Sequence, residues 1–311
     1  MSRERLVVIL GPTATGKSRL AMELALRFGG EIISADSMQV YRYMDIGTAK
    51  PSKEERRRIR HHLIDIRNPD EEFMVTEFKE HAAHVIERIT ERGRLPLLVG
   101  GTGLYIRALL EDYAFPRGPR DERYRQSLWS RARAEGPQAL HQELSAIDPD
   151  TAARIHPNDV RRTIRALEVY RFTGKPLSEI ADRRPGRYDC VKIGLYADRT
   201  LLYGRIDNRV DAMMEAGLLD EVRRLRDLGY GYSLTARQAL GYKELLAYLA
   251  GQDTLAEAVN RIKRETRKFA KRQTTWFKRE RDVYWFDTGT LSFEQVVDNA
   301  STLLAGKLWC W

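Results

Sequence analysis

The sequence has few cysteines and no long apolar run, and both shortages narrow the class of protein. Cys190 and Cys310 are the only cysteines among 311 residues. Two distant cysteines supply neither a disulfide framework nor a zinc site, and they indicate a reducing compartment. No run of about 18 apolar residues occurs, so we expect no membrane span. The apolar part of MSRERLVVIL is too short for a signal peptide. We therefore expect a cytoplasmic protein.

Positive charge is concentrated in one segment of the chain. The formal net charge is +9, and residues 261–281 contain ten Lys or Arg against two Glu. The rest of the chain is therefore nearly balanced. A concentrated basic stripe favours an anionic polymer as partner more strongly than a uniform excess would.

Short apolar runs alternate with helical patterns in the first part of the chain. Runs at 6–10, 31–35 and 95–99 predict buried strands, and 62–66 is a further candidate. Helical spacing of apolar or charged residues covers the intervening segments 17–28, 51–60 and 73–92. This alternation predicts an α/β fold with a P-loop-type parallel sheet flanked by helices.

The pattern changes near residue 115 and returns near residue 190. Residues 124–173 are almost entirely helical in pattern, whereas 190–196 again predicts a strand. We therefore expect a catalytic core of residues 1–116 and 187–311, interrupted by an all-helical insertion domain at 117–186. In the last long helix, a seven-residue interval predicts a buried stripe of Leu255, Ile262, Phe269 and Trp276.

The segment GPTATGKS matches the phosphate-loop pattern G-x-x-x-x-G-K-[ST] at every fixed position, between a predicted strand and a predicted helix. Backbone N–H groups and the helix N-terminus favour an anion there. Lys17 adds a point charge, and the Ser18 hydroxyl can ligate Mg²⁺. We expect a diphosphate or triphosphate at this loop. The predicted phosphate-binding residues are Gly11, Pro12, Thr13, Ala14, Thr15, Gly16, Lys17 and Ser18.

The carboxylate that usually accompanies such a loop is missing from its usual place. NTPases of this class carry an Asp at the end of a second apolar strand, whereas LPLLVGGTG ends in Gly-Gly-Thr. Asp36 and Thr102 each follow a predicted strand, so both should face the ligand crevice. Four roles remain open for Asp36: a metal ligand, a base toward a hydroxyl as in a small-molecule kinase, a base toward another nucleophile, or a helix cap.

Further motifs are spread over nearly the whole chain. They are ADSMQVYRYMDIGTAKP, HHLIDI, LLVGGTGLYIRALL, HPNDVRRTIRALEVYRFTGKPLS, GLLDEVRRL, ALGYKEL and TRKFAKRQTTWFKR. With the phosphate loop, they resemble the motifs of the tRNA dimethylallyltransferases, also called tRNA isopentenyltransferases. The resemblance implies transfer of a dimethylallyl group from dimethylallyl diphosphate to N6 of adenosine 37, in tRNAs that read codons beginning with U. The phosphate loop would then hold the donor's diphosphate together with Mg²⁺.

The resemblance also implies roles for individual residues. Asp36 would accept the proton of the adenine amine, Thr102 would orient the attacking nitrogen, and Arg223 would stabilise the leaving diphosphate. Ser37 and Gln39 would help to recognise the adenine or its neighbours. The implied tRNA-binding residues are Asp36, Ser37, Met38, Gln39, Thr102, Arg125, Arg161, Arg162, Thr163, Ile164, Arg165, Gln238, Gly241, Tyr242, Lys243, Arg264, Lys268, Lys271 and Arg272.

Two other classes of function compete with an RNA prenyltransferase. A small-molecule P-loop kinase would explain residues 1–110 but leave the basic segment without a role. A non-catalytic RNA-binding module would explain the basic segment but leave the phosphate loop without one. The expected partners are the tRNA anticodon stem-loop and dimethylallyl diphosphate, and we expect a monomer.

Overall fold

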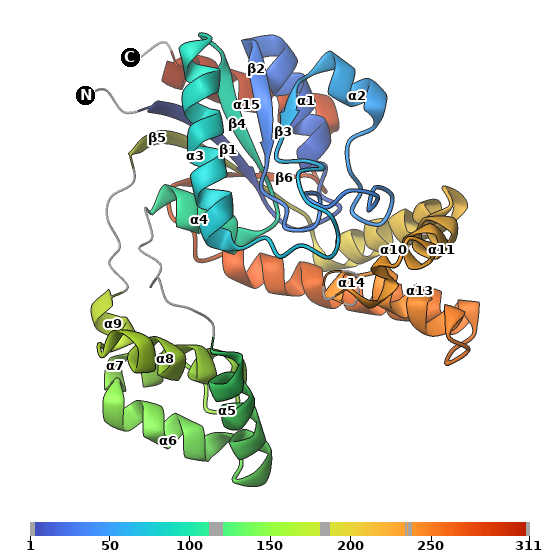
Figure 1. Ribbon diagram of the computed structural model, residues 1–311. Helices are drawn as coiled ribbons and strands as arrows, with labels where there is room; N and C mark the ends of the chain where they lie inside the picture. Colours follow the sequence, from blue (N-terminus) through green and yellow to red (C-terminus); the bar gives the residue numbers. More distant parts are fainter. Residues whose placement is uncertain (1–3, 112–120, 181–186, 234, 236–237, 309–311) are drawn as a thin grey trace. The chain divides into compact units, whose positions relative to one another are not determined.

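The computed structural model describes residues 4–111, 121–180, 187–233, 235 and 238–308. The chain divides into two compact units, one made of residues 1–109 and 187–311 and the other of residues 110–186 (Figure 1). The predicted boundary of the helical insertion at 116/117 lies outside the described residues, and the one at 186/187 lies at their edge.

A six-stranded sheet forms the centre of the larger unit, within the described residues. The strand order is β3-β2-β4-β1-β5-β6, and every pairing is parallel. The strands are β1 (Glu4–Leu10), β2 (Gly30–Ser34), β3 (His61–His62), β4 (Leu95–Gly100), β5 (Tyr188–Tyr196) and β6 (Val283–Asp287). This arrangement confirms the predicted α/β class with a parallel sheet.

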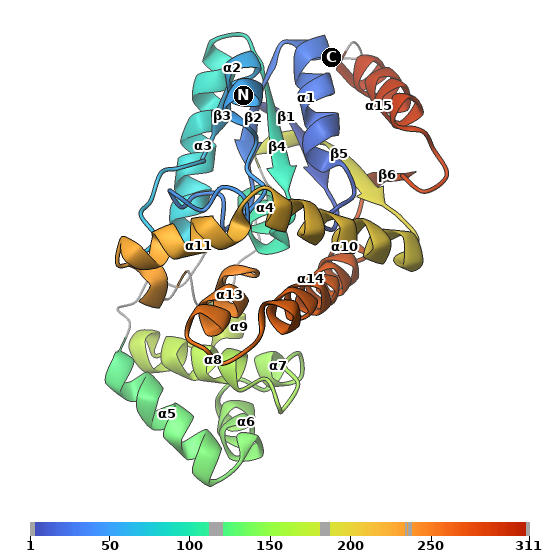
Figure 2. The same cartoon turned by 90° about the vertical axis from the view of Figure 1, so that its right-hand side faces the viewer.

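Helices cover both faces of the sheet, as Figure 2 shows with α3 on one side and α1 and α15 on the other. Leu20 and Leu24 of α1 pack with Val297 and Leu304 of α15 in one buried cluster. Burial on both faces explains why β1 and β4 contain continuous apolar runs. The α-helices of this unit are α1 (Lys17–Phe28), α2 (Lys53–Arg58), α3 (Val75–Glu91), α4 (Gly103–Leu110), α10 (Arg199–Glu215), α11 (Leu218–Asp227), α13 (Tyr242–Leu249), α14 (Leu255–Phe277) and α15 (Phe293–Leu308). Across the described segments, no helix has both the length and the apolar character that a membrane crossing requires.

The smaller unit is helical, as predicted. Leu128, Leu140, Leu144 and Leu167 belong to its buried core. Its helices are α5 (Glu122–Ala134), α6 (Pro137–Ile147), α7 (Pro149–Ala152), α8 (Val160–Thr173) and α9 (Leu177–Ile180).

One candidate strand was predicted too long, and one strand was not predicted. The candidate strand at 62–66 is limited to the two residues of β3, because Leu63 and Asp65 adopt positive φ angles of 61° and 58° that an extended strand does not allow. Strand β6 was missed, although its sequence VYWFD is rich in the β-branched and aromatic residues that favour strands. The other predicted strands, and helices α1 and α3, lie within two residues of their expected bounds.

The buried face of α14 also differs from the predicted stripe. Ile262 is buried, but Leu255, Phe269 and Trp276 are only partly buried. The buried positions of α14 are Ala258, Ile262, Ala270, Gln273 and Phe277, spaced by four, eight, three and four residues. Such spacings spread over a broad apolar face, whereas a seven-residue interval marks only one narrow row along the helix.

Candidate active site

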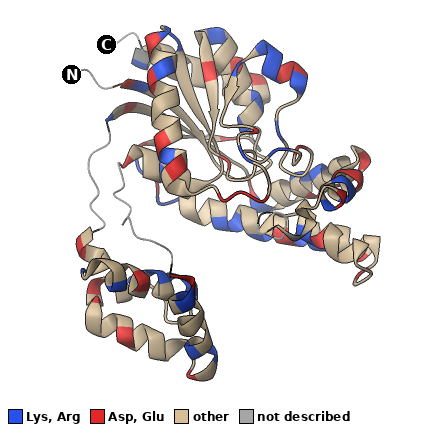
Figure 3. Cartoon of the chain, in the orientation of Figure 1, with Lys and Arg blue, Asp and Glu red and all other residues tan. Residues whose placement is uncertain are grey.

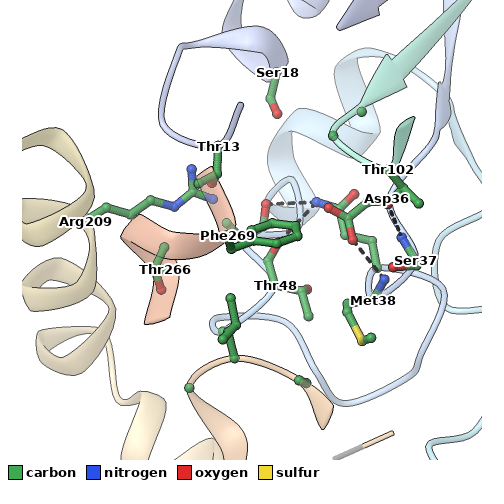
Figure 4. Close-up of a pocket in the computed structure, with 18 of the residues that line it drawn as sticks. Thr13, Ser18, Asp36, Ser37, Met38, Thr48, Thr102, Arg209, Thr266 and Phe269 are labelled. Carbon is green, nitrogen blue, oxygen red and sulfur yellow. Dashed lines mark hydrogen bonds between the residues drawn. The ribbon is translucent and has the colours of Figure 1, made fainter. Parts of the chain in front are cut away.

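A cavity of about 390 Å³ lies beside the carboxyl ends of β1, β2 and β4. Its walls come from the phosphate loop, the segment 36–51, Gly100–Thr102 and helices α10, α13 and α14. Figure 4 shows Asp36, Thr102, Arg209 and Phe269 around this space. The carboxyl ends of parallel strands are where ligands bind in open α/β sheets.

The phosphate loop is held in a tight curve by its own contacts. Gly11 has a φ of 140°, and a Cβ at this position would collide with the carbonyl of Leu195. Thr15 Oγ1 donates a hydrogen bond of 2.9 Å, and Lys17 Nζ one of 2.7 Å, to the carbonyl of Pro12. Of the eight predicted phosphate-binding residues, those that line the cavity are Thr13, Lys17 and Ser18.

The surroundings of Lys17 lower its pKa in the absence of a ligand. Burial, and then the charge of Arg209, lower the pKa of Lys17 from 10.5 to about 7, against the opposing attraction of Asp36. A diphosphate beside the ammonium group would favour its charged form and raise this pKa again. The cavity therefore contains a lysine whose protonation depends on the ligand.

Asp36 and Thr102 are held together at the ends of neighbouring strands. Asp36 Oδ1 accepts a 2.8 Å hydrogen bond from the Met38 N–H, and Thr102 Oγ1 accepts one of 3.1 Å from the Ser37 N–H. Burial raises the pKa of Asp36, opposed first by the N–H groups of Met38 and Gln39 and then by Lys17 and Arg209. Turns rather than a helix follow Asp36, so it does not cap a helix.

Gln39 lines the cavity, but its amide is engaged within the protein. Its Oε1 accepts a 2.8 Å hydrogen bond from Ser34 Oγ, and its Nε2 donates bonds of 3.2 Å to the carbonyls of Thr48 and Ala49. These bonds hold the segment that forms one wall. The structure thus gives Gln39 a loop-holding role, and its contact with a base stays a prediction.

Arg223 does not lie where the leaving diphosphate would bind, and this prediction requires correction. Its side chain is 45% exposed and pairs with Asp220 at 2.8 Å on the surface of α11. Arg209 of α10 lines the cavity instead (Figure 4). Burial lowers the pKa of Arg209, and the charge of Asp36 counteracts this effect. Arg209 is therefore the arginine that the geometry places beside the phosphate loop.

Glu221 holds the segment 45–47, part of one wall of the cavity, and this role was not predicted from the sequence. Its carboxylate accepts hydrogen bonds from the backbone N–H groups of residues 45, 46 and 47, at 2.9, 2.8 and 3.1 Å. It also accepts one of 2.7 Å from the Tyr242 hydroxyl. This carboxylate links α11 and α13 to the loop that closes the cavity.

The donor atoms present suit a magnesium ion that arrives with a diphosphate. No group of three or more His, Cys, Asp or Glu side chains that could hold a metal occurs among the described residues. Ser18 and Asp36 both line the cavity and offer oxygen atoms. Mg²⁺ is commonly bound by one or two protein oxygens together with phosphate oxygens and water.

Comparisons with known proteins identify the family. The model for the IPP transferase family matches residues 39–280. The tRNA dimethylallyltransferase of Geobacillus thermodenitrificans is 51% identical over 308 residues, which are 98% of each chain. That of Carboxydothermus hydrogenoformans is 51% identical over 302 residues, covering 96% of this chain and 97% of the relative. The chain belongs to the tRNA dimethylallyltransferase family.

Solved structures agree with this membership. The tRNA isopentenylpyrophosphate transferase of Bacillus halodurans is 48% identical and has a TM-score of 0.74, with 98% of this chain and 97% of the other covered. A eukaryotic dimethylallyltransferase acting on tRNA is 31% identical, with a TM-score of 0.84 over 99% of this chain and 80% of that chain.

The predicted tRNA contacts in the larger unit fall into two groups. Cavity-lining residues are Asp36, Ser37, Met38, Gln39, Thr102, Gln238, Gly241, Tyr242, Lys243 and Arg272. Arg264, Lys268 and Lys271 are exposed on α14, along which basic residues recur (Figure 3). The hydroxyl of Tyr242 donates its proton to Glu221, and its contact with tRNA stays a prediction.

Two of the predicted contacts in the helical unit, Thr163 and Ile164, require correction. Thr163 and Ile164 of α8 are buried, at 0% and 2% exposure, so they cannot contact RNA. Arg125 forms two hydrogen bonds to Glu168, of 2.8 and 2.7 Å, which join α5 to α8. This pair gives Arg125 a structural role, and its contact with tRNA stays a prediction. The predicted contacts Arg161, Arg162 and Arg165 are exposed on α8, as is Arg171 of the same helix.

Arg209 and Gln273 were missed in the sequence although a signal for each was present. Arg209 follows the apolar positions Leu202 and Ile206 on one helix and precedes buried Val210. Gln273 falls within the buried face of α14. A polar residue at the helical spacing of a buried face indicates a function there, because burying it without a partner is costly.

Proposed function

We propose that this chain transfers a dimethylallyl group from dimethylallyl diphosphate to N6 of adenosine 37, in tRNAs that read codons beginning with U. One observation carries the proposal: the phosphate loop and a partly buried carboxylate, Asp36, line the same cavity. One group is suited to hold a leaving diphosphate and the other to accept a proton from the attacking nitrogen.

The donor side of the reaction requires stabilisation of negative charge. When the bond between the allylic carbon and the diphosphate oxygen breaks, that charge grows on the leaving group. We expect N–H groups of the loop, Lys17 and Arg209 to stabilise it, because such preorganised groups act strongly where water is excluded. Mg²⁺, held by Ser18 and the phosphate oxygens, would add further positive charge.

The acceptor side requires a base. The N6 amine is a weak nucleophile because its lone pair is delocalised into the adenine ring. As the new carbon–nitrogen bond forms, Asp36 accepts the proton that the nitrogen loses. The pKa of Asp36 is raised by burial, which makes the carboxylate a stronger base than an exposed aspartate. Thr102 accepts a hydrogen bond from the Ser37 backbone, and its hydroxyl proton remains available to orient the incoming base.

The tRNA must deliver its base out of the stacked anticodon loop. Extrusion of a base costs a few kcal/mol, which contacts elsewhere on the RNA must offset. Lys268 and Lys271 on the exposed face of α14 supply positive charge for backbone phosphates. Arg161 and Arg165 of α8 are exposed on the helical unit and supply further charge.

The proposal is tested by measuring pyrophosphate release. The protein is incubated with Mg²⁺ and dimethylallyl diphosphate, with or without tRNA. We expect stoichiometric release only when tRNA carrying an unmodified adenosine 37 is present. A matched tRNA with guanosine at position 37 serves as the control. Cleavage of ATP coupled to phosphorylation of a small molecule, without tRNA-dependent release, would instead support the kinase alternative.

A further inference from the structure

Gln273 connects two of the loops that form the cavity. From the buried face of α14, its Oε1 accepts a 2.9 Å hydrogen bond from the backbone N–H of Thr13 in the phosphate loop. Its Nε2 donates one of 2.9 Å to the carbonyl of Gly101, immediately before Thr102. The approach is close, because a Cβ on Gly101 would collide with Nε2. One amide thus holds the loop after β1 and the loop after β4 at a fixed separation.

A second contact joins α14 to the phosphate loop. Ala14 packs against a buried cluster formed by Ala270, one turn before Gln273, with Leu202 and Ile206 of α10. Ala14 also has a φ of 63°, a left-handed conformation that is unfavourable for alanine. Such a conformation persists where surrounding packing determines it. The curve of the loop is therefore supported from outside the loop itself.

The amide is suited to this place in a way that other side chains are not. It accepts from one backbone group and donates to another, and Gln273 is only 7% exposed. An apolar side chain of the same length would leave the Thr13 N–H and the Gly101 carbonyl without this partner. A glutamate could accept from Thr13, but its carboxylate could not donate to Gly101 and would repel a diphosphate.

We propose that Gln273 is a positioning residue that holds the phosphate loop and the Thr102 segment in their diphosphate-binding geometry. Its amide oxygen and nitrogen are bonded to the backbone of Thr13 and Gly101, and it acts through these two groups. The proposal rests on the proposed function for its effect on turnover. Its effect on binding of a diphosphate follows from the loop geometry alone.

The test compares Gln273→Met with Thr275→Ala, a control on the exposed side of the same helix. Binding of inorganic pyrophosphate with Mg²⁺ is measured by titration calorimetry, binding of tRNA by filter retention, and folding by thermal melting. We expect Gln273→Met to weaken pyrophosphate binding about tenfold, the scale of one or two lost hydrogen bonds. Its affinity for tRNA should stay within about twofold of the unmodified chain, because the basic face of α14 is unchanged. Turnover should show a raised KM for dimethylallyl diphosphate with a smaller change in kcat.

Two outcomes would overturn the positioning role. Unchanged pyrophosphate binding in Gln273→Met would show that the loop keeps its geometry without the amide. A parallel loss of pyrophosphate and tRNA binding with a lowered melting temperature would show a general structural role. A third outcome separates the two proposals. If Gln273→Met weakens pyrophosphate binding but the chain with Gln273 transfers no prenyl group to tRNA, the positioning role stands and the proposed function is wrong.

Discussion

Replacing Asp36 by Asn separates the proposed base from the structure around it. Asn retains an oxygen that can accept the 2.8 Å hydrogen bond from the Met38 N–H. The turn after β2 and the placement of Thr102 should therefore survive. What is lost is the capacity to take a proton from the attacking nitrogen.

The expected loss in kcat is large and the expected loss in binding is small. A general base typically contributes a factor of about 10²–10⁴, equivalent to about 2.7–5.4 kcal/mol of transition-state stabilisation. Two electrostatic effects oppose one another in the ground state. Removing a negative charge favours the diphosphate, but it also removes the attraction that raises the pKa of Lys17. The KM for the donor should consequently change little.

The assay is single-turnover transfer of labelled dimethylallyl diphosphate to tRNA, measured against pH. In the unmodified enzyme, activity should fall as the pH drops through the pKa of Asp36, at a value above the ordinary 3.8 because burial raises it. This acid limb should disappear in Asp36→Asn. Asp220→Asn, at an exposed carboxylate that pairs with Arg223, is the control and should retain full activity. Unchanged turnover in Asp36→Asn would refute the assignment of the base.

Three further predictions concern charge in and around the cavity. Arg209→Met should weaken pyrophosphate binding by about tenfold or more, the scale of a lost charge-assisted hydrogen bond. Arg223→Met should leave this binding unchanged. The reverse pattern would show that Arg223, and not Arg209, contacts the leaving diphosphate. Because the pKa of Lys17 is lowered to about 7, pyrophosphate binding above pH 7 should take up a proton and weaken as the pH rises. Calorimetry in buffers of different ionisation enthalpy detects this proton uptake, and its absence would contradict the lowered pKa of Lys17. Lys271→Glu on the exposed side of α14 should weaken tRNA binding and reduce the slope of log affinity against log salt by about one or more. Arg57→Glu on α2 is the control and should leave both the affinity and the slope unchanged. Equal slopes in the two variants would show that tRNA does not contact α14.

The sequence predicted the layered core well because its signals are local and strong. Apolar runs ended by Gly or Asp correspond to β1, β2 and β4, and the phosphate-loop motif has the strand-to-helix context that it requires. The ends of neighbouring parallel strands meet at one edge, so Asp36 and Thr102 could be placed in one crevice before the structure was known.

The contacts that were missed join segments far apart in the chain. Gln273 reaches Thr13 across 260 residues, and Glu221 reaches the loop at residue 45 across 176. A periodicity within one helix shows which face is buried, but it does not show what that face packs against. The choice of Arg223 over Arg209 failed for this reason, since only the packing of α10 and α11 shows which arginine faces the cavity.

The most direct test of the central claim is mass spectrometry of tRNA after incubation with the protein, Mg²⁺ and dimethylallyl diphosphate. Nuclease fragments that span the anticodon loop locate the modified base within the RNA. We predict a mass gain of one C5H8 unit on adenosine 37 and on no other nucleoside. Unmodified RNA, or a gain at a different base, would contradict the account of a loop-bound diphosphate beside a carboxylate that activates this adenine.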